Sequence, residues 1–241
     1  MRLSRPRRAG IAAAVLAVLL ALSACGGGSE NGASKSKGRR SRSYSFLNRD
    51  RVEVSVRDGA LSMTLTTPAL WFNESQGVLA FKPVTGDFKA TATVRTQRAS
   101  NDEPPAATIR LGGLMARDPA SDTTGMQNYV HIVVGNGPSG VLAIEHKTTA
   151  NSNSVYDAPE WPSPDAQLRV CRVGSTFNLY KRPIGSRTWE QAASYDRPDL
   201  PAELQVGADI YSPNTPPDLR VRWDELRYQP VAGVGDCESD R

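Results

Sequence analysis

The amino-acid sequence predicts an all-β protein, a two-sheet antiparallel sandwich. From Tyr44 to Tyr228, short segments alternate apolar and polar residues and end at Gly, Pro, Asn or Asp. Alternation with a period of two is typical of strands that bury one face, and no window keeps a helical period over three turns. Many short strands without a repeat of fixed length favour two packed sheets over a propeller or a β-helix.

The strands are expected in a definite order along the chain. Segments 51–56 and 61–66 flank an Asp-Gly step, which between alternating segments is a strong hairpin signal. Segment 88–96 places Phe88 and Val94 on one face, the pattern of a strand with one buried side. Further strands are expected at 108–116, 128–134, 141–147, 167–173, 176–181, 204–211 and 219–228.

The N-terminus has the layout of a secretory signal. Arginines precede an uncharged apolar run, 11–22, and small residues then lead to Cys25. At about 1.5 Å per residue, this run of about a dozen residues is too short to cross a hydrocarbon core of ~30 Å. The order Leu22-Ser23-Ala24-Cys25 resembles the lipobox of bacterial lipoproteins. The resemblance implies that Cys25 carries a diacylglyceryl thioether with acyl chains such as palmitate and begins the mature protein. An ordinary secretory signal and an uncleaved membrane helix are the alternatives.

This layout predicts four parts: a lipoprotein signal peptide at 1–24, a basic Gly/Ser-rich tether at 25–43, a sandwich at 44–230 and a polar tail at 231–241. The protein is then extracytoplasmic and held by its lipid at the bacterial cell membrane, where acyl chains contribute ~0.8 kcal/mol per buried methylene. Gly26, rather than an aspartate, follows the cysteine, which favours the outer membrane in a cell with two membranes.

The net charge of +4 says little about the sandwich, because much of the positive charge lies in the signal and the tether. The tether has too few apolar side chains to fold. It is either a solvated spacer or is attracted to an anionic membrane or wall by ~1 kcal/mol per charge. A basic tether outside the cytoplasm, without an aromatic platform, disfavours nucleic acid as a partner.

Beyond the N-terminal cysteine the chain has Cys171 and Cys237. They can form a disulfide in an oxidising compartment, but one lies in an expected strand and the other in the polar tail, so their pairing is left open. The cysteines and histidines do not have zinc-site spacing, and no cofactor is expected. The candidates for a structural calcium are Asp118, Asp122 and Asp157, although the dense Asp/Asn/Gly loop of calcium sites is missing.

Several segments of the sandwich follow one another in a recognisable order: 71–74 (Trp-Phe-Asn-Glu), 86–90 (Gly-Asp-Phe-Lys-Ala), 107–117 with Gly-Gly-Leu-Met-Ala-Arg, 129–134, 168–177, Trp189, 204–207 and 221–224. This order resembles the concanavalin A-like lectin/glucanase superfamily, and within it the uncharacterised domain family akin to the C-terminal domains of β-xylosidases. The resemblance covers nearly all of 44–230. It implies a jelly roll with one convex and one concave sheet, and ligands on or beside the concave face.

Catalysis is not expected. The glucanases of this superfamily carry alternating carboxylates on one strand, about 5 Å apart across the sugar, and no such spacing is present. Asp224 and Glu225 are adjacent and therefore face opposite sides of a strand, and Glu145 is the single carboxylate of its strand. A Gly-x-Ser-x-Gly elbow is also missing. His131 is either a structural residue or a base, and a glycoside hydrolase is the least favoured function.

A glycan site needs an aromatic platform and polar side chains that fix hydroxyls. Trp161, in a loop between prolines, is either an exposed platform or a plug that anchors the loop, whereas the other tryptophans and Phe72 are expected in the core. Residues two apart on a strand share a face. On that basis the candidate ligand-binding residues are Trp161, the pairs Tyr129 with His131 and Glu145 with Lys147, and Arg110, Arg117 and Asn128 near the rim.

These observations predict a membrane-anchored lipoprotein whose sandwich is a non-catalytic, carbohydrate-binding module for a glycan or a cell-wall polymer. The alternative is an envelope protein that uses the same sandwich to contact other proteins.

Overall fold

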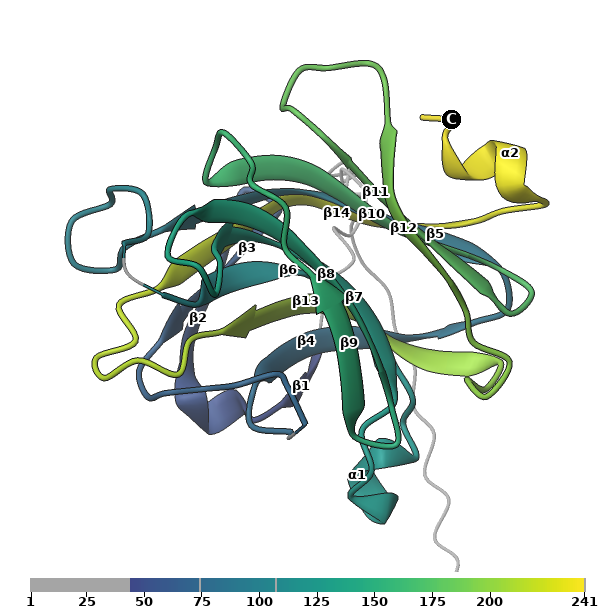
Figure 1. Ribbon diagram of the computed structural model, residues 1–241, viewed down its shortest axis with the longest axis horizontal. Coiled ribbons are helices and arrows are strands. Elements are labelled where there is room, and N and C mark those ends of the chain that lie inside the picture. Colours follow the sequence, from purple (N-terminus) through teal and green to yellow (C-terminus); the bar gives the residue numbers. More distant parts are fainter. Residues whose placement is uncertain (1–43, 74, 107, 241) are drawn as a thin grey trace, which may run out of the picture. The chain divides into compact units, whose positions relative to one another are not determined.

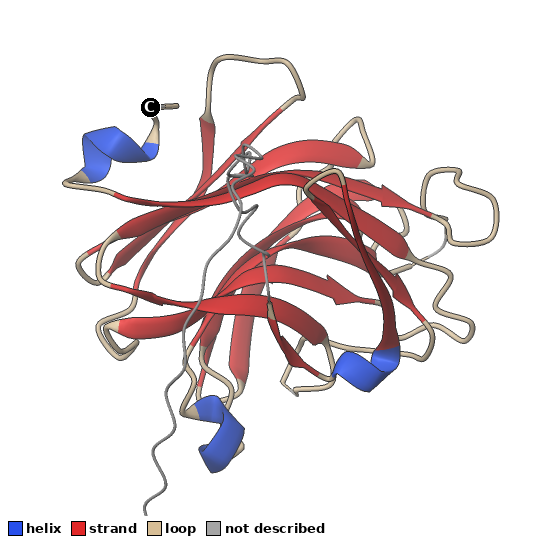
Figure 2. Ribbon diagram, turned by 180° about the vertical axis from the view of Figure 1, so that it is seen from behind, coloured by secondary structure: helices blue, strands red, loops and turns tan. Residues whose placement is uncertain are grey.

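The computed structural model describes residues 44–73, 75–106 and 108–240, which form two antiparallel seven-stranded sheets (Figures 1 and 2). Sheet I has the strand order β1-β4-β13-β6-β7-β8-β9, and sheet II has the order β12-β11-β10-β5-β14-β3-β2. The predicted two-sheet sandwich is therefore confirmed. Cys25, the signal 1–24 and the tether 25–43 lie outside the described residues.

The strands of sheet I are β1 (Ser45–Leu47), β4 (Val78–Thr85), β6 (Arg110–Arg117), β7 (Tyr129–Asn136), β8 (Leu142–Ala150), β9 (Asn153–Asp157) and β13 (Glu203–Tyr211). Those of sheet II are β2 (Val52–Arg57), β3 (Ala60–Leu65), β5 (Phe88–Gln97), β10 (Asp165–Val173), β11 (Thr176–Arg182), β12 (Glu190–Asp196) and β14 (Arg220–Pro230). The helical turns are η1 (Arg49–Arg51), α1 (Ser121–Thr124) and α2 (Val234–Cys237). None of these helices is long and apolar enough to cross a membrane, a finding limited to the described residues.

Sequence alternation missed the strands β1, β4, β9 and β12. β9 and β12 are edge strands whose residues are mostly exposed or half-buried, so neither of their faces needs to be apolar. β4 begins with Val-Leu-Ala-Phe, a continuous apolar run, because both faces of this strand are covered. Period-two alternation requires one buried and one wet face, and these strands do not meet that condition.

The inner faces of the two sheets enclose the main core. Trp223 of β14 is fully buried between the sheets, and its Nε1 donates a 2.7 Å hydrogen bond to the carbonyl of Gly113 in β6. Gly113 faces the outer side of sheet I, where a Cβ would come within 2.1 Å of the carbonyl oxygen of Ile132. The expectation that Trp71, Trp189 and Trp223 are buried is confirmed: Trp223 lies in the main core, and Trp71 and Trp189 lie in smaller clusters on the outer faces of the sheets.

The segment 69–72 covers part of the outer face of sheet I, the face turned away from sheet II. The Ala69 amide donates to the carbonyl of Ser212 at 2.8 Å, which holds the segment beside the end of β13. The Trp71 ring lies against Gly77, in space that any side chain at that position would occupy. Side chains below this segment are therefore buried although they point away from the main core.

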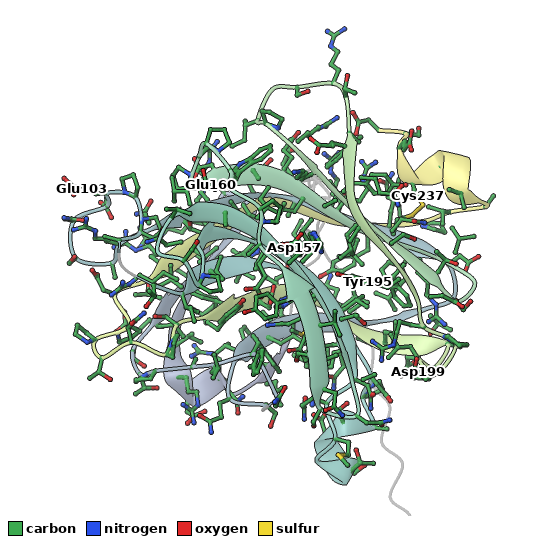
Figure 3. All side chains as sticks on the ribbon, viewed as in Figure 1. Glu103, Asp157, Glu160, Tyr195, Asp199 and Cys237 are labelled. Carbon is green, nitrogen blue, oxygen red and sulfur yellow. A yellow bond between two sulfur atoms is a disulfide. The ribbon has the colours of Figure 1, made fainter. Side chains whose placement is uncertain are left out.

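The C-terminal tail covers part of the outer face of sheet II (Figures 1 and 3). A disulfide joins Cys171 in β10 to Cys237 at the end of α2. Asp240 forms ion pairs with Arg169 at 3.0 Å and Arg182 at 2.8 Å, and both guanidinium groups stack on the Trp189 ring. The pairing left open by the sequence is thus present, and residues 231–240 pack on the sandwich rather than forming a separate tail. Such disulfides are typical of proteins that fold outside the reducing cytoplasm.

Candidate functional site

Four of the residues proposed from the sequence meet on the outer face of sheet I. Tyr129 and His131 lie on β7, and Glu145 and Lys147 lie on the neighbouring strand β8. In the antiparallel register His131 is directly opposite Lys147. Because side chains two apart share a face, the register brings both pairs to one surface. All four are buried under the segment 69–72 and its neighbours.

The imidazole of His131 bridges two buried carboxylates. Its Nδ1 lies 3.1 Å from Oδ2 of Asp209, and its Nε2 lies 3.2 Å from Oε1 of Glu145. Asp209 comes from β13, and β6 lies between that strand and β7. The residue of β6 opposite Asp209 is Gly113, which has no side chain, so the carboxylate can reach across β6 to the imidazole.

Lys147 is buried at the other end of this network. Its Nζ lies 3.0 Å from Oε1 of Glu145, donates to the carbonyl of Trp71 at 2.6 Å and faces the Tyr211 ring at 5.3 Å. The Tyr211 hydroxyl donates to the same Glu145 oxygen at 2.7 Å. His131, Lys147 and Tyr211 all contact Oε1, and among the described residues Oε2 of Glu145 has no hydrogen-bond partner. Glu145 therefore retains one oxygen that can accept a bond from a ligand.

Burial and neighbouring charges shift the pKa values of the network in opposite directions. Burial alone would raise the pKa of Glu145, but the hydrogen bond from His131 and the charge of Lys147 outweigh it and lower the pKa from 4.5 to about 2. Burial lowers the pKa of Lys147, although the nearby Glu145 opposes this. Burial raises the pKa of Asp209 and that of Tyr211. Near neutral pH, Glu145 is thus a carboxylate held in a fixed position.

A cavity of about 300 Å³ opens above Glu145 and Lys147. Two half-exposed rings, Phe72 at 40% and Tyr156 at 45% exposure, stand at its mouth, with centroids 6.1 Å apart in an edge-to-face arrangement. Tyr129 does not line the cavity; its hydroxyl donates to the carbonyl of Phe72 at 3.0 Å and holds that segment in place. The lining consists of Leu70, Trp71, Phe72, Ile109, Pro138, Glu145, Lys147, Tyr156, Tyr211 and Pro213. We call this the aromatic cavity.

The structure corrects two aromatic expectations. Trp161 is only 9% exposed and packs in the main core, with its Nε1 donating to the carbonyl of Asp165 at 3.1 Å. The backbone amide of Trp161 bonds to the carbonyl of Leu142 at 2.9 Å, which folds the loop back on β8 and turns the ring inward. The exposed-platform interpretation was wrong, and Trp161 anchors its loop. The expectation that Phe72 packs in the core was also wrong.

The other proposed residues lie outside the aromatic cavity, and their side chains form bonds with loop residues. Arg110 is buried and donates to the carbonyls of Pro217 and Ala106, and Asn128 accepts a bond from the Asn151 amide at 2.8 Å. Neither lines the aromatic cavity, so they do not join the four residues of β7 and β8 there. Arg117 is fully buried and pairs with Asp122 at 2.7 Å, so it does not lie at a rim.

The candidate calcium ligands do not come together in the described part of the chain. No group of three or more His, Cys, Asp or Glu side chains is placed there to hold a metal ion. Asp118 caps the Ala120 amide, Asp122 pairs with an arginine, and Asp157 accepts a bond from the Ala158 amide.

Sequence reasoning missed the residues that complete the site: Asp209 and Tyr211 on β13, Tyr156 on β9 and Phe72 in the covering segment. A signal was present for the first two, because Asp209 and Tyr211 share one face of a strand whose opposite face is apolar. Their contact with His131 depends on the order of the strands in the sheet. Asp209, for example, is 78 positions away from His131 in the sequence, and no local pattern predicts that they meet.

No protein-family model matches this sequence, and a comparison with curated proteins finds no match either. Solved structures do match. A functionally unknown protein from Saccharomyces cerevisiae has 16% identity and a TM-score of 0.63, and the match covers 79% of this chain and 98% of that one. A xylan β-1,4-xylosidase from Bacillus halodurans has 13% identity and a TM-score of 0.54, over 72% of this chain but only 33% of the xylosidase. A legume lectin-like domain from Entamoeba histolytica has 10% identity and a TM-score of 0.51, over 79% of this chain and 91% of that one.

The chain has the concanavalin A-like sandwich fold. At identities of 16% or less, this similarity concerns the fold alone and does not carry a binding site from one protein to another. Function therefore has to be argued from the aromatic cavity itself.

The network makes stability depend on acidity. The pKa of Glu145 is lowered to about 2, so its contribution to stability is complete above its ordinary value of 4.5 and is lost as the pH falls toward 2. The pKa of Asp209 is raised, so this group lowers the free energy of unfolding as the pH rises and it ionises. We expect the free energy of unfolding to fall across this acidic range in the wild type and to fall less in Glu145→Gln. Urea titrations at a series of pH values measure both curves, and parallel curves would contradict the assignment to Glu145.

Proposed function

We propose that the sandwich is a non-catalytic carbohydrate-binding module and that the aromatic cavity is its binding site. The observation that carries this proposal is the pair of half-exposed rings, Phe72 and Tyr156, at the mouth of a cavity with a fixed carboxylate and ammonium at its base. Small-molecule sites combine apolar and aromatic walls with a few well-placed polar groups.

The chemistry of the lining suits a sugar ring. One face of a pyranose is rich in C–H groups and stacks on an aromatic ring, while its hydroxyls need hydrogen-bond partners. Oε2 of Glu145 can accept from a hydroxyl, and Nζ of Lys147 has a third proton beyond those directed to Glu145 and Trp71. The Glu145 carboxylate is already held by His131 and Tyr211, and the Lys147 ammonium by Glu145 and the carbonyl of Trp71, so binding would order few side chains.

The arrangement of the carboxylates supports a role without catalysis. Hydrolysis of a glycosidic bond uses two carboxyl groups that flank the bond. Here the imidazole of His131 occupies the space between Glu145 and Asp209, and Asp209 is fully buried. A substrate cannot reach both carboxylates at once.

We also propose that the sandwich is related to the C-terminal domains of β-xylosidases. It is supported by the order of the sequence segments and by the similar fold of part of the Bacillus halodurans xylosidase. We also propose that the mature protein is tethered outside the cytoplasm by a lipid on Cys25. The signal-like N-terminus and the disulfide between Cys171 and Cys237 support this location. A lipid anchor raises the effective concentration of a surface glycan and makes a weak site sufficient.

A glycan array probed with residues 44–241, followed by calorimetric titration of the glycan that binds most strongly, tests the binding function. Tyr156→Ala and Phe72→Ala are each expected to lower the affinity for that glycan by at least about tenfold, because each removes a ring from the cavity mouth. Val155→Ala is the matched control: Val155 is 69% exposed on the same strand but faces the opposite side, and its loss should leave affinity unchanged.

Failure of every glycan on the array to bind the wild type would overturn the proposal. The same holds if Val155→Ala weakens binding as much as Tyr156→Ala does. Retention of an envelope protein by the wild type, with no glycan binding, would favour the alternative of a protein-interaction module.

A further inference from the structure

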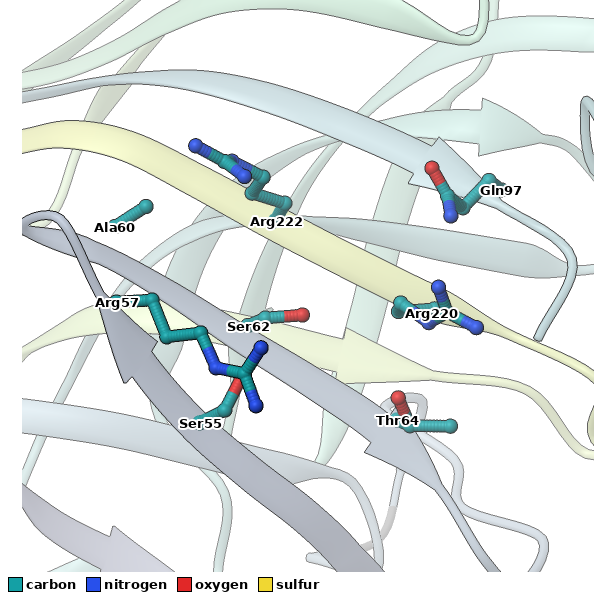
Figure 4. Close-up of a pocket in the computed structure, with 8 residues that line it drawn as sticks. All are labelled: Ser55, Arg57, Ala60, Ser62, Thr64, Gln97, Arg220 and Arg222. Carbon is teal, nitrogen blue, oxygen red and sulfur yellow. The ribbon is translucent and has the colours of Figure 1, made fainter. Parts of the chain in front are cut away.

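A second recess lies on the outer face of sheet II, on the opposite layer of the sandwich from the aromatic cavity. It has a volume of about 420 Å³ and lies over β2, β3, β14 and the end of β5 (Figure 4). Its lining consists of Ser55, Arg57, Ala60, Ser62, Thr64, Gln97, Arg220 and Arg222. We call it the arginine groove.

The strand register builds this groove as a regular array. Ser62 of β3 is opposite Ser55 of β2 on one side and Arg222 of β14 on the other. Thr64 is likewise opposite Arg220, which in turn is opposite Gln97 of β5. Hydroxyl, amide and guanidinium groups therefore lie side by side across neighbouring strands, with Glu53 opposite Thr64 at one end of the array.

The groove is electropositive. Three arginines line it and no carboxylate does, within the described part of the chain. Arg220 and Arg222 each have one acidic neighbour outside the lining, Asp102 and Asp224, both at 2.8 Å. Asp224 is shared with a further arginine, Arg95, at 3.4 Å.

The exposed Arg57 stands out because no ion pair or hydrogen bond involves its guanidinium among the described residues. The nearest acidic residue on the same face of β2 is Glu53, four positions away and outside the lining. A strand rises by about 3.3 Å per residue, so that carboxylate is roughly 13 Å along the strand. Arg57 is thus available for an anion.

We propose that the arginine groove binds a saccharide that carries carboxylate or phosphate groups. Guanidinium groups bind such anions through two parallel hydrogen bonds. The hydroxyls of Ser55, Ser62 and Thr64 make no hydrogen bonds to other described residues, and they suit sugar hydroxyls. This second site does not depend on the aromatic cavity, so either can fail while the other stands.

The lining favours a saccharide over a membrane surface. Peripheral membrane binding uses apolar side chains that enter the bilayer beside the basic ones. None of the described residues that line the arginine groove is aromatic or a large aliphatic. The groove is also recessed, whereas lipid headgroups present a flat surface.

The test uses the purified full chain and two acidic probes, each with an uncharged counterpart. The probes are tetragalacturonate with its methyl ester, and a phosphorylated mannotetraose with its dephosphorylated form. We expect at least one acidic probe to bind about tenfold more tightly than its counterpart at low salt, and the preference to shrink as salt screens the charges. Arg57→Gln and Arg222→Gln should each remove most of that preference.

Arg187→Gln is the matched control, because Arg187 is an exposed arginine in the loop between β11 and β12, away from the groove. It removes the same charge and leaves the basic tether intact, and affinity should stay within about twofold. The melting temperature of Arg57→Gln should match that of the wild type, since Arg57 has no partner to lose. Arg222→Gln loses an exposed pair with Asp224, so its melting temperature should change little.

Equal affinity for the acidic and uncharged forms of both probes would overturn the proposal. So would an equal loss in Arg187→Gln, which would indicate general charge attraction. Binding to phosphatidylglycerol vesicles over phosphatidylcholine vesicles, abolished by Arg57→Gln in a chain that binds no acidic saccharide, would assign the groove to a membrane instead.

Discussion

Replacing Glu145 by Gln is expected to destabilise the sandwich by about 3–5 kcal/mol, because it leaves the buried ammonium of Lys147 without its carboxylate. His131 loses its charged partner at Nε2 in the same change. Chemical denaturation with urea near neutral pH measures the loss as a shift of the unfolding midpoint.

Two further variants show whether the loss of stability comes from a buried, unpaired charge or from the loss of any carboxylate. The double variant Glu145→Leu with Lys147→Met removes both charges and should cost less than the single change. Glu160→Gln alters an exposed carboxylate that forms no ion pair in the described structure (Figure 3), and it should change stability by less than about 0.5 kcal/mol. A single Glu145→Gln variant as stable as Glu160→Gln would contradict the assigned role of the network.

Removing the disulfide, by Cys171→Ala together with Cys237→Ala, is expected to cost about 4 kcal/mol, since it frees a loop that spans 66 positions of the chain. The loss also releases α2 from the outer face of sheet II. Urea denaturation of the wild type and the double variant, both without reductant, gives the difference in unfolding free energy.

Asp240→Asn shows whether the tail is held by the disulfide or by its ion pairs. Asp240 is half-exposed, so its pairs with Arg169 and Arg182 should contribute less than about 1 kcal/mol together. If Asp240→Asn costs as much as the loss of the disulfide, the ion pairs hold the tail and the prediction fails.

The two outer faces of the sandwich carry different chemistry. On sheet I, the covering segment with Trp71 buries Glu145 and Lys147 and leaves an aromatic cavity above them. On sheet II, the tail covers the area around Trp189, and the arginine groove over β2 and β3 stays open. We propose the first face as the site for a sugar ring and the second as a site for an acidic saccharide.

Much of the fold was predictable from alternation alone. Ten expected strands correspond to strands of the structure, and the Gly-Gly step before Leu114 marks a close approach, where Trp223 bonds to the Gly113 carbonyl. The strands that alternation missed are those without one buried and one wet face, such as β9, which carries Tyr156. The error at Trp161 has a related cause: a sequence shows that a ring lies in a loop but not which way the loop folds.

The sequence by itself determined the all-β class and that Tyr129 shares a strand face with His131, and Glu145 with Lys147, because both follow from the period of two along a strand. Only the tertiary structure decided that Asp209 and Tyr211 join them, since strand order brings β13 next to β6, and Gly113 leaves room across it. Only the tertiary structure, too, decided that Cys171 meets Cys237 and that Phe72 stands at the mouth of the aromatic cavity. These contacts join residues far apart in the chain, and their free energy depends on packing that no local pattern records.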